Sequence, residues 1–104
     1  MDLEQARLEG KNLFTDGTTV GEWFSAMESK FGCHKTHLIL ALAPFEHVAL
    51  SQHTMRLYGN EIMLSLTAKL ASGDCVLTQD RYFFFTDSTD AVVFKLIWHH
   101  KEKQ

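Results

Sequence analysis

The sequence predicts an α+β fold of two layers, in which two N-terminal helices and a C-terminal helix pack on an antiparallel sheet of three to four strands. Apolar residues recur at helical spacing in the first third of the chain. After His37 they alternate or run together in stretches that are typical of strands. With 104 residues, of which 45% are hydrophobic and 22% charged, the chain has the size and composition of one globular domain, residues 1–104.

A helix is expected over residues 20–31. The segment Thr19-Val20-Gly21-Glu22 is a capping box, in which the threonine hydroxyl accepts a hydrogen bond from the backbone three residues later and the glutamate reaches back. The apolar side chains after it fall on one stripe, and Gly32 supplies a stop. The residues of this stripe are Val20, Trp23, Phe24, Met27 and Phe31.

A second helix with a weaker pattern is expected over residues 3–13, and the turn Thr15-Asp16-Gly17 separates it from the first. Its apolar side includes Gly10. A glycine in the middle of a helix costs about 1 kcal/mol relative to alanine. The segment is therefore expected to be a loosely docked N-terminal arm.

The first strand is expected at residues 38–43, where both alternating sets of residues are apolar and Pro44 ends the run. Residues 45–53 fit either a helical turn that begins at Pro44 or irregular structure.

A hairpin is expected next, with strands at residues 54–58 and 61–70 joined by a turn at Gly59-Asn60. After a turn at Ser72-Gly73-Asp74, a long strand is expected over residues 75–86. The second strand of the hairpin has one apolar face, formed by Ile62, Leu64, Leu66, Ala68 and Leu70.

The last element is predicted to be a helix, because Asp87 or Ser88 can cap its start and acidic side chains favour the positive end of the helix dipole. A strand over residues 92–98 is the competing interpretation, since the Val, Phe, Ile and Trp residues there favour sheets.

Charge and hydropathy exclude several classes of partner. The net charge of −3 comes from residues 1–32, which carry six acidic and three basic side chains, whereas residues 33–104 carry seven of each. Scattered lysines and arginines do not form the basic field that a nucleic-acid backbone requires. The longest apolar run, residues 38–45, is far shorter than the roughly 20 residues of a membrane span, and the N-terminus does not resemble a signal peptide. The sequence therefore predicts a cytoplasmic protein without a nucleic-acid or membrane partner.

Cys33, His34 and His37 are the candidate metal ligands, with His99 and His100 as further ones. Thiolates and imidazoles at such spacing can bind zinc. The sequence contains neither the paired clusters of a structural zinc site nor the His-Glu-x-x-His motif of a catalytic one. Accordingly, surface or capping roles are favoured for these histidines, and no metal or other cofactor is predicted.

No catalytic residue is predicted. Cys33 or Cys75 could act as a nucleophile in acyl transfer, but neither lies in an elbow motif, and the sequence has no phosphate-binding glycine loop. Without an export signal, both cysteines are expected to be free thiols buried as small apolar residues. Asp87 and Asp90 are better explained as helix caps than as a catalytic pair.

The aromatic segment Tyr82, Phe83, Phe84 and Phe85 is the candidate protein-binding site. Alternation in a strand places Tyr82 and Phe84 on one face and the other two on the opposite face. One face is expected to meet the helices. The other is expected to remain exposed, and exposed apolar patches commonly mark protein partners.

The end of the chain resembles the ends of small accessory proteins encoded by tailed bacteriophages, over about a fifth of the sequence. The resemblance implies a non-enzymatic protein in the host cytoplasm, and it assigns no functional residue. The residues that carry it are Phe83, Phe85, Asp87, Asp90-Ala91, Phe94-Lys95-Leu96 and Trp98.

The predicted function is a small non-enzymatic protein-binding module, such as a phage-encoded inhibitor of a host or defence protein, whose partner is another protein or a second copy of itself. One alternative is a structural subunit of a larger assembly, in which apolar strand surface is buried between copies. The other is a small metal-dependent enzyme that uses Cys33, His34 and His37.

Overall fold

The computed structural model describes residues 3–15, 17–32, 35–78 and 81–102, with the backbone alone at 35–37, and it confirms the α+β class. Within these residues the sheet has three antiparallel strands in the order β1-β3-β2. In chain order the elements are α1 (Leu3–Leu13), α2 (Val20–Phe31), α3 (Lys35–Ala41), β1 (Glu46–Ala49), α4 (Gln52–Ser72), β2 (Cys75–Leu77), β3 (Tyr82–Phe85) and α5 (Ser88–Glu102).

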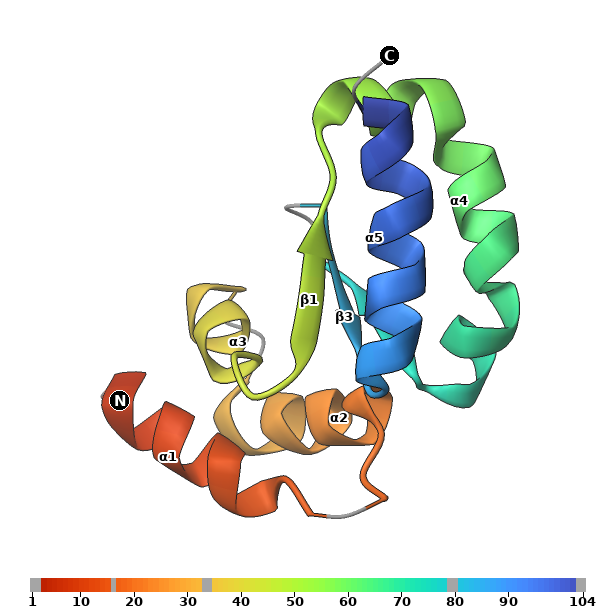
Figure 1. The fold of residues 1–104 in the computed structure, drawn as a ribbon. Coiled ribbons are helices and arrows are strands. Elements are labelled where there is room, and N and C mark those ends of the chain that lie inside the picture. Colours follow the sequence, from red (N-terminus) through yellow and green to blue (C-terminus); the bar gives the residue numbers. More distant parts are fainter. Residues whose placement is uncertain (1–2, 16, 33–34, 79–80, 103–104) are drawn as a thin grey trace.

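Helices lie on both faces of the sheet. The helices α4 and α5 lie side by side against one face, and α2 and α3 cover the other, with α1 packed on them (Figure 1). The sequence predicted one helical layer. The predicted helices α2 and α5 lie on opposite faces instead, and α3 and α4, which were expected to be strands, add one helix to each layer.

The alternation predicted for β3 divides the core into two clusters, since Phe83 and Phe85 face α5 while Phe84 faces α2. The first cluster consists of Val48, Leu50, Ile62, Leu66, Cys75, Phe83, Phe85, Ala91, Phe94 and Trp98. The second cluster consists of Val20, Trp23, Met27, Leu38, Ala41, Leu42, Phe45 and Phe84.

The three helices expected from the sequence, α1, α2 and α5, are confirmed. At the start of α2 the Thr19 hydroxyl accepts a hydrogen bond from the Glu22 N–H at 3.1 Å, as a capping box requires. At the start of α5 the Asp87 carboxylate accepts one from the Thr89 N–H at 2.8 Å. The helix, and not the competing strand, is therefore the correct interpretation of the last element.

The strand predicted at residues 38–43 is wrong, because this segment belongs to α3 and the turn after it. A short run that is apolar at every position satisfies the period of a strand and of a buried helix alike, so the pattern did not separate them. The strand β1 lies instead in the segment that the sequence left open. The side chains buried against α2 keep helical spacing, and they are Leu38, Ala41, Leu42 and Phe45.

The hairpin predicted over residues 54–70 is also wrong, because these residues belong to the single helix α4. The Ser51 hydroxyl caps its start by accepting a hydrogen bond from the Thr54 N–H at 3.2 Å. Gly73 ends it in the left-handed conformation, with a φ of 81°. Two caps 22 residues apart therefore outweigh the turn propensity of Gly59-Asn60 between them.

The alternating pattern of α4 has a helical interpretation as well. The apolar residues at positions 62, 64, 66, 68 and 70 alternate as in a strand. Three of them, Ile62, Leu66 and Leu70, are also spaced four residues apart. Residues four apart share one side of a helix. Ile62 and Leu66 are accordingly buried, and Leu64 is exposed on the opposite side.

The long strand predicted over residues 75–86 corresponds to two strands, β2 and β3, which pair antiparallel. The Thr78 N–H donates to the Tyr82 carbonyl at 3.0 Å, and the Arg81 N–H donates to the Thr78 carbonyl at 3.2 Å. Arg81 has a φ of 66°, a left-handed conformation that reverses the chain. The predicted strand is therefore wrong in its middle and correct at both ends.

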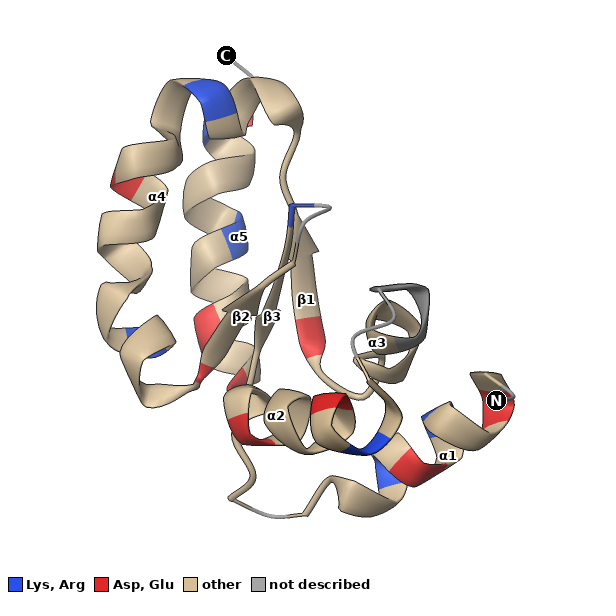
Figure 2. Ribbon diagram, turned by 180° about the vertical axis from the view of Figure 1, so that it is seen from behind, with Lys and Arg blue, Asp and Glu red and all other residues tan. Residues whose placement is uncertain are grey.

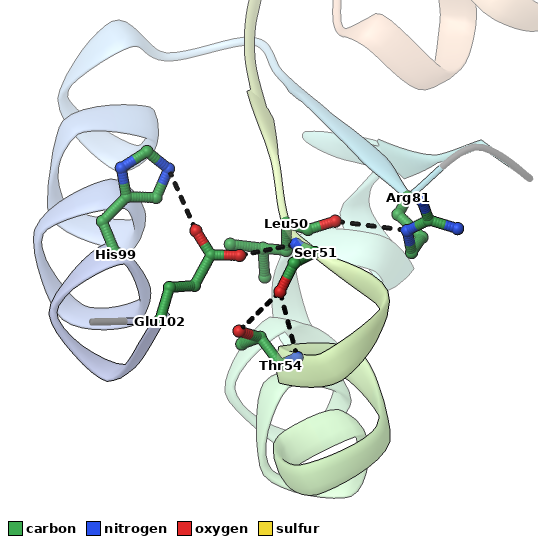
Figure 3. Close-up of polar contacts among 6 residues, drawn as sticks. All are labelled: Leu50, Ser51, Thr54, Arg81, His99 and Glu102. Atoms are coloured by element: carbon green, nitrogen blue, oxygen red, sulfur yellow. Dashed lines mark hydrogen bonds and ion pairs between the residues drawn. The ribbon is translucent and has the colours of Figure 1, made fainter. Parts of the chain in front are cut away.

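Contacts at both ends hold α4 and α5 antiparallel. At one end Lys69 Nζ lies 2.8 Å from Asp90 Oδ2. At the other, Glu102 Oε1 accepts a hydrogen bond from the Ser51 N–H at 2.5 Å, so the last turn of α5 caps the first turn of α4 (Figure 3). Burial raises the pKa of Glu102, but hydrogen bonds from Ser51 outweigh burial and lower it below its usual value.

Gly10 and Gly59 both lie in the middle of a helix, but their surroundings differ. The Trp23 indole N–H donates to the Gly10 carbonyl at 2.7 Å, and a Cβ at position 10 would lie 2.8 Å from Trp23 Cζ2. Among the described residues, nothing beyond the backbone of α4 itself lies within 4 Å of a Cβ at position 59. Gly10 therefore allows Trp23 to pack closely against α1, whereas no described side chain packs against Gly59 in this way.

We expect Gly10→Ala to lower the free energy of unfolding by about 1 to 3 kcal/mol, because the new methyl group displaces a buried indole ring. Gly59→Ala is the matched control and is expected to raise it by up to about 1 kcal/mol, because alanine favours the helix. Urea denaturation followed by tryptophan fluorescence measures both changes. Effects of the same sign would contradict the packing role assigned to Gly10.

A second prediction concerns Glu102. Its pKa is lower in the folded chain than the usual value of 4.5, so its contribution to stability is present above that value and is lost as the pH falls through the folded pKa. We expect Glu102→Gln to cost about 1 kcal/mol at pH 7, and the difference from the parent chain to shrink between pH 5 and pH 3. Urea denaturation across this range, with the exposed Glu28→Gln as control, tests it. A difference that is independent of pH would rule out the carboxylate as its source.

Candidate protein interface

The aromatic residues expected to form a binding surface are mostly buried. Phe83, Phe84 and Phe85 have exposed fractions of 0%, 3% and 1%. Tyr82 is partly exposed beside His47, with 5.8 Å between the ring centroids. The expected free face of the strand is therefore absent from the described part of the chain, because α2 and α3 cover it.

Two of the three candidate metal ligands, Cys33 and His34, lie outside the described residues. His37 belongs to α3, and its side chain also lies outside the description. Among the residues that the structure describes, no group of three or more His, Cys, Asp or Glu side chains is placed to hold a metal ion.

Cys75 is a free thiol in the first core cluster. Burial raises its pKa to about 12, and the nearby Asp90 carboxylate adds to the shift. The thiolate is the nucleophilic form of cysteine, and it is scarcely populated at neutral pH with such a pKa. Cys75 is therefore a core residue and does not supply the nucleophile for acyl transfer.

Helix α5 is apolar on two opposite sides. Its inner side carries Ala91, Phe94 and Trp98, which are buried against the sheet and α4. Its outer side carries four apolar side chains that are at least half exposed. These are Val92 (55%), Val93 (50%), Leu96 (70%) and Ile97 (50%).

Helix α4 adds two leucines to the same side of the molecule. Ile62 and Leu66 face the core, and Leu57 and Leu64 lie across the helix from them, with exposed fractions of 58% and 75%. Because α4 and α5 form one layer against the sheet, their outer sides form one surface (Figure 1). We call it the outer α4/α5 face, and it consists of Leu57, Leu64, Val92, Val93, Leu96 and Ile97.

Charged residues are widely spaced on the two helices of this surface. Helices α4 and α5 together carry seven Lys, Arg, Asp and Glu residues in 36 positions, and Figure 2 shows long uncharged stretches between them. Asp90 is paired with Lys69, and Lys95 lies one turn after the buried Ala91, on the side of α5 nearer the sheet.

Glu61 is an exposed acid within the face. It lies four residues after Leu57 and three before Leu64, on the same side of α4 as both. The apolar side chains of α5 therefore form the uninterrupted part of the face.

The sequence contains a signal for this face that the aromatic strand obscured. Seven of the eight residues from Ala91 to Trp98 are apolar. A helix that buries one side needs only three or four apolar residues in two turns. The excess therefore predicts a second apolar side on this helix.

None of the helices in the described residues is long and apolar enough to cross a membrane. Comparisons with models of known protein families, with curated proteins and with solved structures find no match for this chain. The role of the outer α4/α5 face is therefore inferred from its geometry and chemistry alone.

Proposed function

We propose that this chain is a small protein-binding module that engages its partner through the outer α4/α5 face. The observation that carries the proposal is the second apolar side of α5, where four side chains face away from the core. The fold does not use this side, because the inner side already anchors the helix to β3.

The size of the face supports this role. Its six side chains are half to three-quarters exposed and together present on the order of 600 Å² of apolar surface, the size of the largest patch on a typical monomer. Since the partner buries a similar area, the face is large enough for specific binding.

An inhibitor of a host or defence protein is the most specific form of this proposal. Such a protein acts by occupying a site on its target, and the resemblance of the C-terminal residues to bacteriophage accessory proteins is in line with that role. Of the residues that carry the resemblance, Phe83, Phe85 and Phe94 lie in the core, whereas Leu96 lies on the outer α4/α5 face.

We expect Leu96→Glu to weaken partner binding by at least about 100-fold, because an interface that excludes water leaves the carboxylate without solvation or a counter-charge. Affinity capture from a bacterial lysate, followed by calorimetric titration with the captured protein, measures the effect. The side chain is exposed, so the far-UV circular dichroism and the melting temperature are expected to stay unchanged.

Leu8→Glu is the matched control, since Leu8 lies on α1 with an exposed fraction of 60%. It introduces the same charge at similar exposure, away from the face, and is expected to leave binding intact. If both variants bind as the parent chain does, or both lose binding equally, the outer α4/α5 face is not the binding surface.

A further inference from the structure

We propose that the outer α4/α5 face binds a second copy of this chain, with α5 packed antiparallel on α5 of the copy and α4 on α4. This inference rests on the proposed function and names its partner.

The apolar side chains of the face are arranged around one level, except Leu57, which lies about two turns nearer the start of α4 than Leu64. The Lys69–Asp90 ion pair and the contact between the Tyr58 and Trp98 rings, with centroids 6.0 Å apart, set how far α4 and α5 are offset. Lys69 and Asp90 lie at the same level. Counting five residues from Lys69 toward the start of α4 gives Leu64, and counting five from Asp90 toward the end of α5 gives Lys95. Leu64 is therefore level with the middle of the 92–97 stripe. A twofold axis at this level packs each stripe on its own copy and Leu64 on Leu64. An isologous interface requires such self-complementarity.

The two ends of α5 differ in their acidic side chains. Its first turn contains Asp90, which is paired with Lys69, and follows Asp87, whereas its last turn contains Lys101 beside Glu102. An antiparallel second copy places Lys101 of one helix near Asp87 of the other, and it also opposes the two helix dipoles. A parallel arrangement would bring Asp87 near Asp87 of the copy and align the dipoles.

The area of the face matches what a stable dimer needs. Interfaces of standard size bury roughly 800 Å² on each partner. The apolar part supplies on the order of 600 Å² of this, and the polar residues at its border supply the rest. Because Val92, Val93, Leu96 and Ile97 carry no charge, this part of the face can meet an identical surface without repulsion.

The first test is sedimentation equilibrium of the full chain between 1 and 200 µM. We expect a species of twice 11.9 kDa at the upper concentrations. Leu96→Glu is expected to weaken the dimer by at least about 100-fold, and Leu8→Glu to leave it unchanged. Circular dichroism establishes that both variants are folded.

The second test is a charge exchange across the axis. Thr89 precedes Val93 by one turn and His100 follows Leu96 by one turn, so both exposed residues lie at opposite ends of the outer stripe. Thr89→Lys and His100→Glu are each expected to weaken the dimer by roughly fivefold, because each brings like charges together across the interface. In the double variant, lysine meets glutamate, and the dimer is expected to regain the strength of the parent.

The outcomes separate the two proposals. A chain that stays monomeric at 200 µM but captures another protein, in a manner abolished by Leu96→Glu, would overturn the second copy as partner and leave the binding function standing. A dimer insensitive to Leu96→Glu would overturn this interface. A dimer that Leu96→Glu disrupts, without rescue in the double variant, would overturn the antiparallel arrangement.

Discussion

The burial of β3 on both faces is the constraint on which the rest of this fold depends. The Phe83 and Phe85 rings contact Phe94 of α5, with centroids 4.8 and 5.2 Å apart, whereas Phe84 packs between the sheet and α2. Each such side chain contributes about 1.5 to 3 kcal/mol on burial. A single four-residue strand thereby joins two helical layers. The backbone just after it adds to the connection, because the Thr86 hydroxyl accepts a hydrogen bond from the Val20 N–H at 2.7 Å and so fixes the start of α2.

Because the phenylalanines of β3 are buried in the two core clusters, the apolar surface for the proposed partner lies elsewhere. It comes from the outer sides of α4 and α5, which have no further layer of the described chain to cover them. Polar contacts lie at the ends of the face, at Lys69–Asp90 and at Glu102–Ser51, and the Tyr58 and Trp98 rings pack between the helices. The two helices are thus held in a defined relation without using the apolar area between those ends.

Local signals in the sequence predicted α2 from a capping box and a helical period, α5 from its caps, and α1 from a weaker helical pattern. They failed for α4, where a strand alternation through Ile62 and Leu66 coincides with a spacing of four and Gly59-Asn60 suggests a turn. The caps at Ser51 and Gly73 were also in the sequence, and they decided the outcome. Contacts between distant residues, such as Glu102 with Ser51, are not encoded in any local pattern and require the fold itself.

The candidate interface was missed for a related physical reason. An apolar residue in a short chain is assigned to the core by default, yet the inner side of α5 needs only Ala91, Phe94 and Trp98 for its attachment. The outer valines, leucine and isoleucine gain little from folding, since half or more of each side chain stays in water. Their apolar surface is recovered only when another surface covers it. In the proposed function, stability and binding are therefore carried by opposite sides of one helix, so a substitution on the outer side is expected to remove binding without loss of stability.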